Sequence, residues 1–274
     1  MYNSDPDEGA LSNLPRASRF GPLQQLALGL VFLTRLPIPL RGALPDDAVA
    51  RSAWSFPVAG ALVALVGAGG AIAGDAIGLP AVACALLALA ATMAMTGALH
   101  EDGLADTADG LGGGRTRAQK LEIMKDSRIG SYGVLALIVG VGLRAAALTS
   151  ALQDSRLHLL GALVAAHAGS RALLPLLMRA LPSVRPGGLG ASVGVPSSLS
   201  SITALVLGTA AVFWGLGDIL GLIGFVAAAV GMVAVGALAR RQLGGYTGDV
   251  LGAAQQIGEI ILLLAAVAQI PLPF

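Results

Sequence analysis

The residues best suited to chemistry lie in one acidic segment, where positions 100–110 read HEDGLADTADG. If this segment is helical, Asp102, Asp106 and Asp109 stand at i, i+4 and i+7 and share one face within an arc of about 60°. Because like charges this close repel one another, the spacing predicts a bound cation between them. Carboxylate oxygens suit Mg²⁺, which takes its other ligands from water and substrate phosphates. The segment therefore predicts a magnesium site for phosphate chemistry, against the alternative of a solvated acidic helix end.

A group of glycines and charged residues follows this segment directly. Gly112, Gly113 and Gly114 free the backbone to end a helix and to approach phosphates closely. The charged candidates beyond them are Lys120, Lys125, Asp126 and Arg128. Their cations can neutralise phosphate oxygens, and Asp126 adds a carboxylate that could bind metal. An ordinary basic loop explains the cations about as well, but their closeness to the aspartates favours a shared polyphosphate site.

Charged and polar residues also occur inside later apolar stretches, where they are costly unless they line a polar cavity. Arg171 follows His167 by four residues, so both share one helix face, and we expect Arg171 to contact a substrate anion. A hydrogen-bonded contact between helices explains His167 equally well. Along the last apolar stretch, Asp249 is a candidate for substrate or metal binding and Glu259 for metal binding. As an alternative, Asp249 caps the helix that begins there.

The composition excludes a water-soluble globule and a nucleic-acid-binding protein. Hydrophobic residues make up 55% of the 274 positions and charged residues 12%, against about 25% charged residues in an average soluble domain. The mean hydropathy is +0.78. A net charge of +1 provides no basic field for nucleic acid. The 38 glycines suit close packing of transmembrane helices, and the single cysteine, Cys84, excludes an intramolecular disulfide.

Apolar stretches of about 20 residues, the length that crosses a bilayer core, predict the fold class. Seven spans are expected, at residues 54–73, 80–99, 132–152, 157–181, 202–216, 219–239 and 250–270. The stretch 21–40 is also apolar, but Arg35, Pro37 and Pro39 cut it short, so we expect an interfacial or re-entrant helix there. The protein is thus predicted to be an all-α polytopic transmembrane bundle. We expect residues 1–20 to form a flexible cytoplasmic tail and residues 21–274 a single integral membrane catalytic domain.

The distribution of cations predicts the orientation in the membrane, because short loops rich in Lys and Arg stay in the cytoplasm. Cations gather before the first span, between the second and third spans, and near residues 179–185 and 240–241. The connection 74–79 has no cation and carries only Asp75. The acidic segment and the start of the last span are therefore expected on the cytoplasmic side, and the carboxyl terminus outside.

Several of these motifs together resemble the cobalamin synthase family, the adenosylcobinamide-GDP ribazoletransferases. The motifs are HEDGLADTADG at 100–110, MKDSRIG at 124–130, GGLG at 187–190, GYTGD at 245–249 and FLTRLPIP at 32–39. The resemblance covers most of the chain. Two positions depart from the family pattern: Glu101 stands where an apolar residue is usual, and Gln256 where an acid is expected, which weakens a metal role for the last span.

The resemblance implies a reaction, a cofactor and a location. The family joins adenosylcobinamide-GDP to α-ribazole or its 5′-phosphate and releases GMP, with Mg²⁺ as cofactor, in the bacterial cytoplasmic (inner) membrane with the active site facing the cytoplasm. It implies catalytic roles for Asp102, Asp106, Asp109, Lys125, Asp126 and Arg128, and substrate contacts for His100, Gly112, Gly113, Lys120, Arg171 and Asp249. Which aspartate is a base and which are metal ligands stays open, as does a homo-oligomer.

Two other classes of membrane protein offer alternative readings. CDP-alcohol phosphotransferases also hold metal with spaced aspartates, but their motif has an Ala-Arg pair where this chain has three glycines. A secondary transporter would use Arg171 and Glu259 as coupling residues. Against a transporter, the sequence contains no repeated half, and its acids gather toward one face of the membrane.

Overall fold

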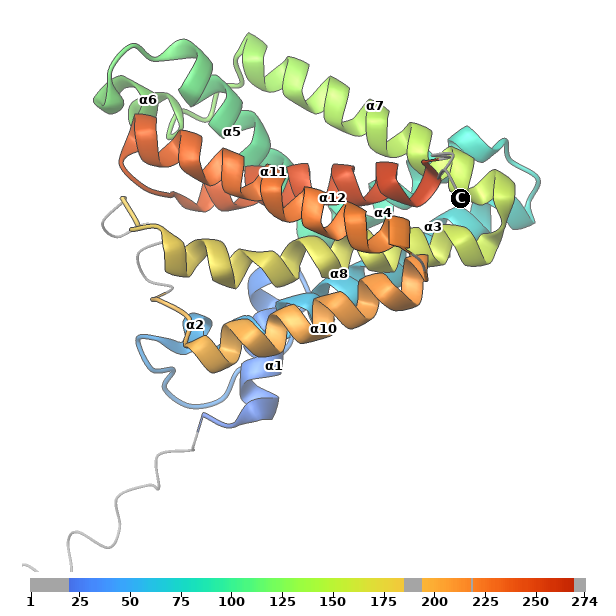
Figure 1. The fold of residues 1–274 in the computed structure, drawn as a ribbon, viewed down its shortest axis with the longest axis horizontal. Coiled ribbons are helices and arrows are strands. Elements are labelled where there is room, and N and C mark those ends of the chain that lie inside the picture. The colour runs from blue at the N-terminus through green and yellow to red at the C-terminus, as the bar shows by residue number, and fades with distance from the viewer. Residues whose placement is uncertain (1–19, 185–193, 218, 269–274) are drawn as a thin grey trace, which may run out of the picture.

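The computed structural model describes residues 20–184, 194–217 and 219–268, and these form an arrangement of helices (Figure 1). The helices in chain order are α1 (Pro22–Leu33), α2 (Ala48–Ser52), the 3-10 helix η2 (Ala53–Ser55), α3 (Phe56–Ala76), α4 (Ala81–Thr96), α5 (Leu99–Gly113), α6 (Arg117–Ile123), α7 (Ser131–Asp154), α8 (Arg156–Ala180), α10 (Ser198–Leu216), α11 (Ile219–Leu243) and α12 (Gly248–Val267). Within the described part, β structure is limited to an isolated bridge between Ser183 and Tyr246.

The number of membrane spans agrees with the sequence. In the described ranges, six helical stretches are long and apolar enough to cross a membrane, and the count rises to seven if α4 and α5 together form one broken span. The all-α polytopic bundle is therefore confirmed. Helix α1 has 12 residues and ends at Leu33, before Arg35 and the prolines, as the sequence predicted. At 1.5 Å per residue it is about 18 Å long, too short to cross a core of about 30 Å.

The expected second span, residues 80–99, is interrupted by a break in the chain close to its end. Helix α4 ends at Thr96, and the axes of α4 and α5 differ by 90°. Gly97 (φ +67°) and Ala98 (φ +56°) both adopt the left-handed conformation that ends an α-helix. The backbone N–H of Arg35 donates to the carbonyl of Met95 at 2.7 Å. This bond satisfies a carbonyl in the last turn of α4, where carbonyl groups have no partner within the helix. The acidic segment therefore starts a new helix within the bundle.

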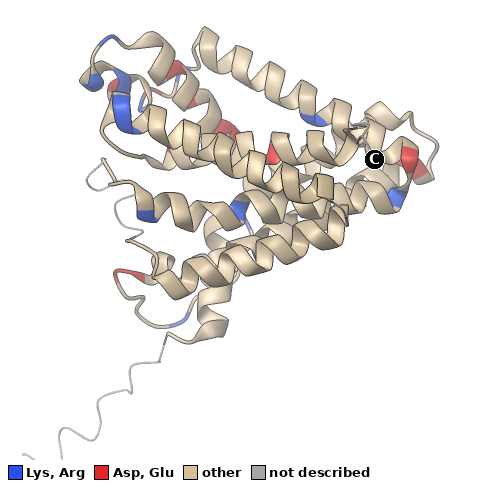
Figure 2. Cartoon of the chain, in the orientation of Figure 1, with Lys and Arg blue, Asp and Glu red and all other residues tan. Residues whose placement is uncertain are grey.

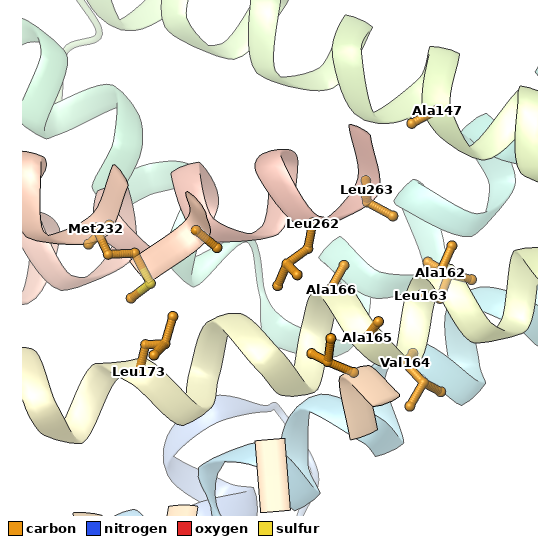
Figure 3. Close-up of a cluster of buried hydrophobic side chains, with 14 of the residues drawn as sticks. Ala147, Ala162, Leu163, Val164, Ala165, Ala166, Leu173, Met232, Leu262 and Leu263 are labelled. Atoms are coloured by element: carbon orange, nitrogen blue, oxygen red, sulfur yellow. The ribbon is translucent and has the colours of Figure 1, made fainter. Parts of the chain in front are cut away.

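Helix α8 is the central element of the bundle and is buried along almost its entire length, from Leu159 to Met178. Small residues let its neighbours approach closely, as predicted for the glycines. A Cβ at Gly161 on α8 would meet the backbone of Gly215 on α10, and one at Gly60 on α3 would meet the backbone of His167. Figure 3 shows apolar side chains of this core, among them Leu163 on α8 and Leu262 on α12.

The charges divide the bundle into two ends (Figure 2). Most coloured segments in that view lie at the end that carries α6, where blue and red occur together. At the opposite end, Asp75 in the last turn of α3 forms an ion pair with Arg156 at 2.6 Å. The end of α12 lies near this second group, since His158 at the start of α8 is 2.9 Å from the carbonyl of Ala266. The connections near residues 75 and 156 and the end of α12 thus lie at one end of the bundle, as the sequence predicted.

Candidate active site

The acidic segment forms helix α5, which contacts both α7 and α12 (Figure 1). This confirms the helical spacing on which the sequence argument rested. Gly103 allows the close approach to α12, because a Cβ there would lie 2.8 Å from the carbonyl oxygen of Asp249. Of the aspartates on this helix, Asp102 is exposed and Asp106 is half-buried. Two of the three predicted carboxylates are therefore accessible on one face.

Asp109 has a different environment from the other two aspartates. Its side chain is 7% exposed, and its two oxygens accept hydrogen bonds from the backbone N–H groups of Gly130 (2.7 Å) and Gly133 (2.9 Å). These donors belong to the beginning of α7, where the first N–H groups of a helix have no partner within it. Asp109 thus shares its helix face with Asp102 and Asp106, and both of its oxygens are engaged by another helix.

The glycines after the aspartates end α5, as the sequence predicted. The helix stops at Gly113, and the chain turns at Gly114 into α6, which starts with a capping box formed by Thr116 and Gln119. Lys120 of α6 donates from Nζ to the carbonyl of Leu111 at 2.6 Å. A cation at the carboxyl end of a helix is favourable, so this predicted substrate contact also has a structural role. Gly112 packs against the ring of Tyr132.

Two adjoining pockets lie where α5, α6 and the start of α7 meet. One of about 750 Å³ includes Gly113, Arg115 and Lys125, and one of about 480 Å³ includes Asp109 and Arg128. Asp126 lines both pockets. Glycine backbone and cationic side chains on pocket walls suit a phosphate-bearing ligand. The structure thus places the predicted residues of the 124–130 motif beside the end of the acidic helix.

Asp126 and Arg128 form an ion pair with each other at 2.6 Å. The hydrogen bonds from Arg128 lower the pKa of the Asp126 carboxyl to about 2, and the pKa of Arg128 is raised in return. Both side chains are solvent-accessible, so the pair can exchange partners at little cost. Asp126 is therefore ionised at neutral pH, as a metal ligand or a phosphate-positioning partner of Arg128 must be.

A buried ionic network lies at the start of α5, among α7, α8 and α12. Nη1 of Arg144 on α7 is 2.9 Å from Glu101 and 3.1 Å from Glu259. The other oxygen of Glu259 lies 3.0 Å from His167 and 3.6 Å from Arg171, both on α8. The shared helix face of His167 and Arg171 is thus confirmed, and their partner in the structure is a carboxylate on α12.

His100 completes this network, with Nδ1 at 3.5 Å from Nη2 of Arg171. Both side chains are nearly fully buried, His100 at 3% exposure and Arg171 at 1%. The roles predicted for them in substrate binding, and for Glu259 in metal binding, stay predictions. Sequence reasoning missed Arg144, although an arginine inside the apolar span 132–152 is itself a signal, because such a charge requires a buried partner.

The 245–249 motif connects α11 to α12 in the chain, and it contacts the segment that follows α8. Tyr246 exchanges backbone hydrogen bonds with Pro182 (2.9 Å) and Val184 (3.0 Å), and Gly245 lies against the Pro182 carbonyl, where a side chain would not fit. Thr247, not Asp249, caps α12, so the capping alternative for Asp249 is wrong. Asp249 is in the first turn, next to α5. The 187–190 motif lies outside the described residues.

The residues fit a magnesium ion held by few protein ligands. In the described part of the chain, no three His, Cys, Asp or Glu side chains converge as a self-sufficient metal site. Mg²⁺, however, is commonly held by one or two carboxylates together with substrate phosphates and water. Asp102 and Asp106 provide two accessible carboxylates one helical turn apart. This donor set matches a metal that arrives with a phosphorylated substrate.

Comparison with known proteins decides the family. The model of the Cobalamin-5-phosphate synthase family matches residues 25–267. The chain belongs to the Cobalamin-5-phosphate synthase family. It is 49% identical over 246 residues to the adenosylcobinamide-GDP ribazoletransferase of Bradyrhizobium diazoefficiens, covering 90% of this chain and 94% of that one. It is 44% identical over 251 residues to the protein of that name from Mesorhizobium japonicum, covering 89% and 93%. No solved structure matches the chain.

Within this Cobalamin-5-phosphate synthase family member, the structure explains the two departures from the expected motif. Glu101 is buried because Arg144 lies beside it, so an unusual acid has a cationic partner. Gln256 donates to the side chain of Gln255 at 2.9 Å, and Gln255 donates to Glu259 at 2.6 Å. These side chains belong to the network within the bundle.

Proposed function

We propose that this chain is a membrane-embedded adenosylcobinamide-GDP ribazoletransferase. It joins adenosylcobinamide-GDP to α-ribazole, or to α-ribazole 5′-phosphate, and releases GMP. The observation that carries the proposal is the family match across residues 25–267, with relatives of that name covering about nine-tenths of the chain. The pockets at the end of α5 support the proposal, because Gly113, Lys125 and Arg128 on their walls suit a diphosphate substrate.

We further propose that Asp102 and Asp106 hold Mg²⁺ together with the diphosphate of the substrate. When bound, the ion neutralises charge that develops on the phosphate oxygens of the leaving GMP. Asp249 lies beside α5 and is a further candidate ligand, as is Asp126 in the pocket wall. The chain's contribution is to fix these carboxylates on rigid helices, so that little reorganisation is needed when the reaction occurs.

One bond forms and one bond breaks at a single phosphorus atom. A hydroxyl of the ribazole attacks the phosphorus that carries the cobinamide arm, and the bond from that phosphorus to GMP breaks. Lys125 and Arg128 balance the charge of the departing phosphate. The hydroxyl proton passes to a carboxylate of the site that does not hold the ion. GMP leaves with the electron pair of the broken bond.

We place the site at the cytoplasmic face of the bacterial inner membrane. The α5–α6–α7 end of the bundle carries most of the loop cations, which favours retention in the cytoplasm (Figure 2). A nucleotide-activated substrate is available from that side. The lipid bilayer is the partner of the exposed apolar side chains on α7, α10 and α11, such as Leu135, Val206 and Val230.

The deciding experiment uses the full-length protein purified in detergent and returned to liposomes. Adenosylcobinamide-GDP, α-ribazole or its phosphate, and Mg²⁺ are supplied, and cobalamin and GMP are measured. Equal amounts of both products are expected, and none without Mg²⁺. Release of CMP from a CDP-alcohol donor, with no reaction of the corrinoid, would instead identify a CDP-alcohol phosphotransferase. Substrate uptake into liposomes without product formation would identify a transporter.

A further inference from the structure

We infer that Asp109 is a positioning residue, whose carboxylate holds the start of α7, and the charged segment before it, against the acidic helix. The inference rests on the proposed function, because it concerns the same site. It separates Asp109 from Asp102 and Asp106, which the sequence pattern treats alike. The separation depends on what the carboxylate of each residue contacts.

The contacts of Asp109 are those of a helix cap supplied from another helix. Residue 130, the position that would ordinarily cap α7, is a glycine without a capping side chain. Oδ2 of Asp109 accepts from the N–H of Gly130 at 2.7 Å, and Oδ1 accepts from the N–H of Gly133 at 2.9 Å. An anion here also faces the positive end of the α7 dipole. Each oxygen thus already has a donor, in a side chain that is nearly buried.

This cap fixes the residues proposed to contact phosphate. Lys125, Asp126 and Arg128 lie on the short stretch between α6 and α7, at the end of α5 (Figure 1). The stretch is held at one side by Met124, which is buried and packs directly on Gly110 of α5. Its other end is held by the hydrogen bond from the backbone N–H of Gly130 to Asp109. Two successive positions of α5 therefore anchor both ends of the stretch.

Gly130 and Gly133, at the start of α7, are required by this close approach and not by their backbone angles. A Cβ at Gly133 would meet the carboxylate of Asp109 and would lie 3.0 Å from the carbonyl oxygen of Ala105. A Cβ at Gly130 would also meet the carboxylate. An alanine at Gly133 should therefore displace Asp109 without changing its chemistry. Gly142, on the same helix, has open space around its Cβ position and provides a matched control.

The test measures both the order of the 124–134 segment and the metal requirement. Hydrogen exchange by mass spectrometry is recorded for Asp109→Asn, Asp109→Ala, Gly133→Ala, Gly142→Ala and Asp106→Asn in liposomes. Steady-state turnover is measured with Mg²⁺ and both substrates varied. Asp109→Ala should raise exchange in this segment roughly five- to thirtyfold, the scale of losing a helix cap. Asp109→Asn keeps one acceptor and should fall between Asp109→Ala and the unaltered protein.

The kinetic readouts separate positioning from metal binding. Asp109→Ala and Gly133→Ala should both raise the KM for adenosylcobinamide-GDP, with the Mg²⁺ concentration at half-maximal rate within about twofold of the unaltered protein. Asp106→Asn should raise that Mg²⁺ concentration and leave exchange unchanged, and Gly142→Ala should change neither. The inference is overturned if Asp109→Ala leaves exchange unchanged and shifts the Mg²⁺ requirement as Asp106→Asn does. If the unaltered protein lacks transferase activity, the proposed function fails, while the exchange results still decide the role of Asp109.

Discussion

Arg144 on α7 donates from Nη1 to Oε1 of Glu259 on α12 at 3.1 Å, between two side chains that are each 1% exposed. The same nitrogen contacts Glu101 on α5, so one guanidinium joins the helix that carries the aspartates to two others. Breaking a buried pair by removing one partner leaves an uncompensated charge and is strongly destabilising. Arg144 therefore matters for the assembly of the site although it lies apart from the accessible aspartates.

The first prediction concerns this arginine. Arg144→Met should lower the free energy of unfolding by about 3–5 kcal/mol, because Glu101 loses its cationic partner and Glu259 loses one of its own. Thermal unfolding in detergent measures the change. Glu101→Leu should cost less than Arg144→Met, since Arg144 keeps Glu259 as a partner. Arg156→Met, which removes an exposed pair with Asp75, is the control and should cost less than about 1 kcal/mol. Equal losses of unfolding free energy for Arg144→Met and Arg156→Met would show that the buried pair contributes no more to stability than the exposed pair.

The second prediction concerns the accessible aspartates. Asp102→Asn and Asp106→Asn should each lower turnover at least about a hundredfold, the scale of losing major electrostatic stabilisation of a transition state. Raised Mg²⁺ should partly restore at least one of them, because fewer anionic ligands weaken a hard cation. Cys84→Ala, at a buried position remote from α5 in the sequence, should be nearly silent. The assay compares initial rates at matched protein amounts in liposomes. Wild-type rates in both aspartate variants would remove the metal proposal.

The third prediction concerns Arg128. Arg128→Lys keeps the charge but loses the planar fork that grips two phosphate oxygens, so the KM for adenosylcobinamide-GDP should rise. The KM for ribazole and the Mg²⁺ requirement should barely change. A rise in the ribazole KM alone would instead place this residue at the acceptor.

A fourth prediction follows from the pKa of Asp126, which Arg128 lowers to about 2. A lowered carboxyl pKa means that the ion pair is complete above the ordinary pKa of about 4 and is lost only as pH falls through the lowered value. Arg128→Gln should raise the pKa of Asp126 toward its ordinary value, which is still acidic. The rate profile of Arg128→Gln between pH 6 and 9 should therefore keep the shape of the unaltered protein's profile. A new acidic limb within this range would show that Asp126 lies in a different environment.

The fifth prediction concerns orientation. Reporter fusions after Gly113 and Gly244 should be cytoplasmic, and one after Gly78 should be periplasmic, because of the distribution of cations. The structure requires the first two to agree, since α6 contacts α11. Opposite locations for Gly113 and Gly244 would separate the two parts of the site and contradict the model of one catalytic face.

The sequence by itself determined the class of fold and the identity of the acidic helix. Both follow from local rules: about 20 apolar residues suffice to cross a bilayer, and the spacing of Asp102, Asp106 and Asp109 matches a helical repeat wherever the helix lies. The end of α5 at its glycines, and the end of α1 before Arg35, were likewise predictable, because glycine and proline act on the backbone of their own segment.

Only the tertiary structure decided how the three aspartates differ and which buried charges meet. Asp109 contacts N–H groups 21 and 24 positions away, and Arg144 joins Glu101 and Glu259, which are 43 and 115 positions away from it. The break at Gly97 and Ala98, with Arg35 completing the hydrogen bonds of α4, is of the same kind. A helical period specifies which side chains share a face, whereas the neighbour of that face depends on how distant helices satisfy polar groups away from water.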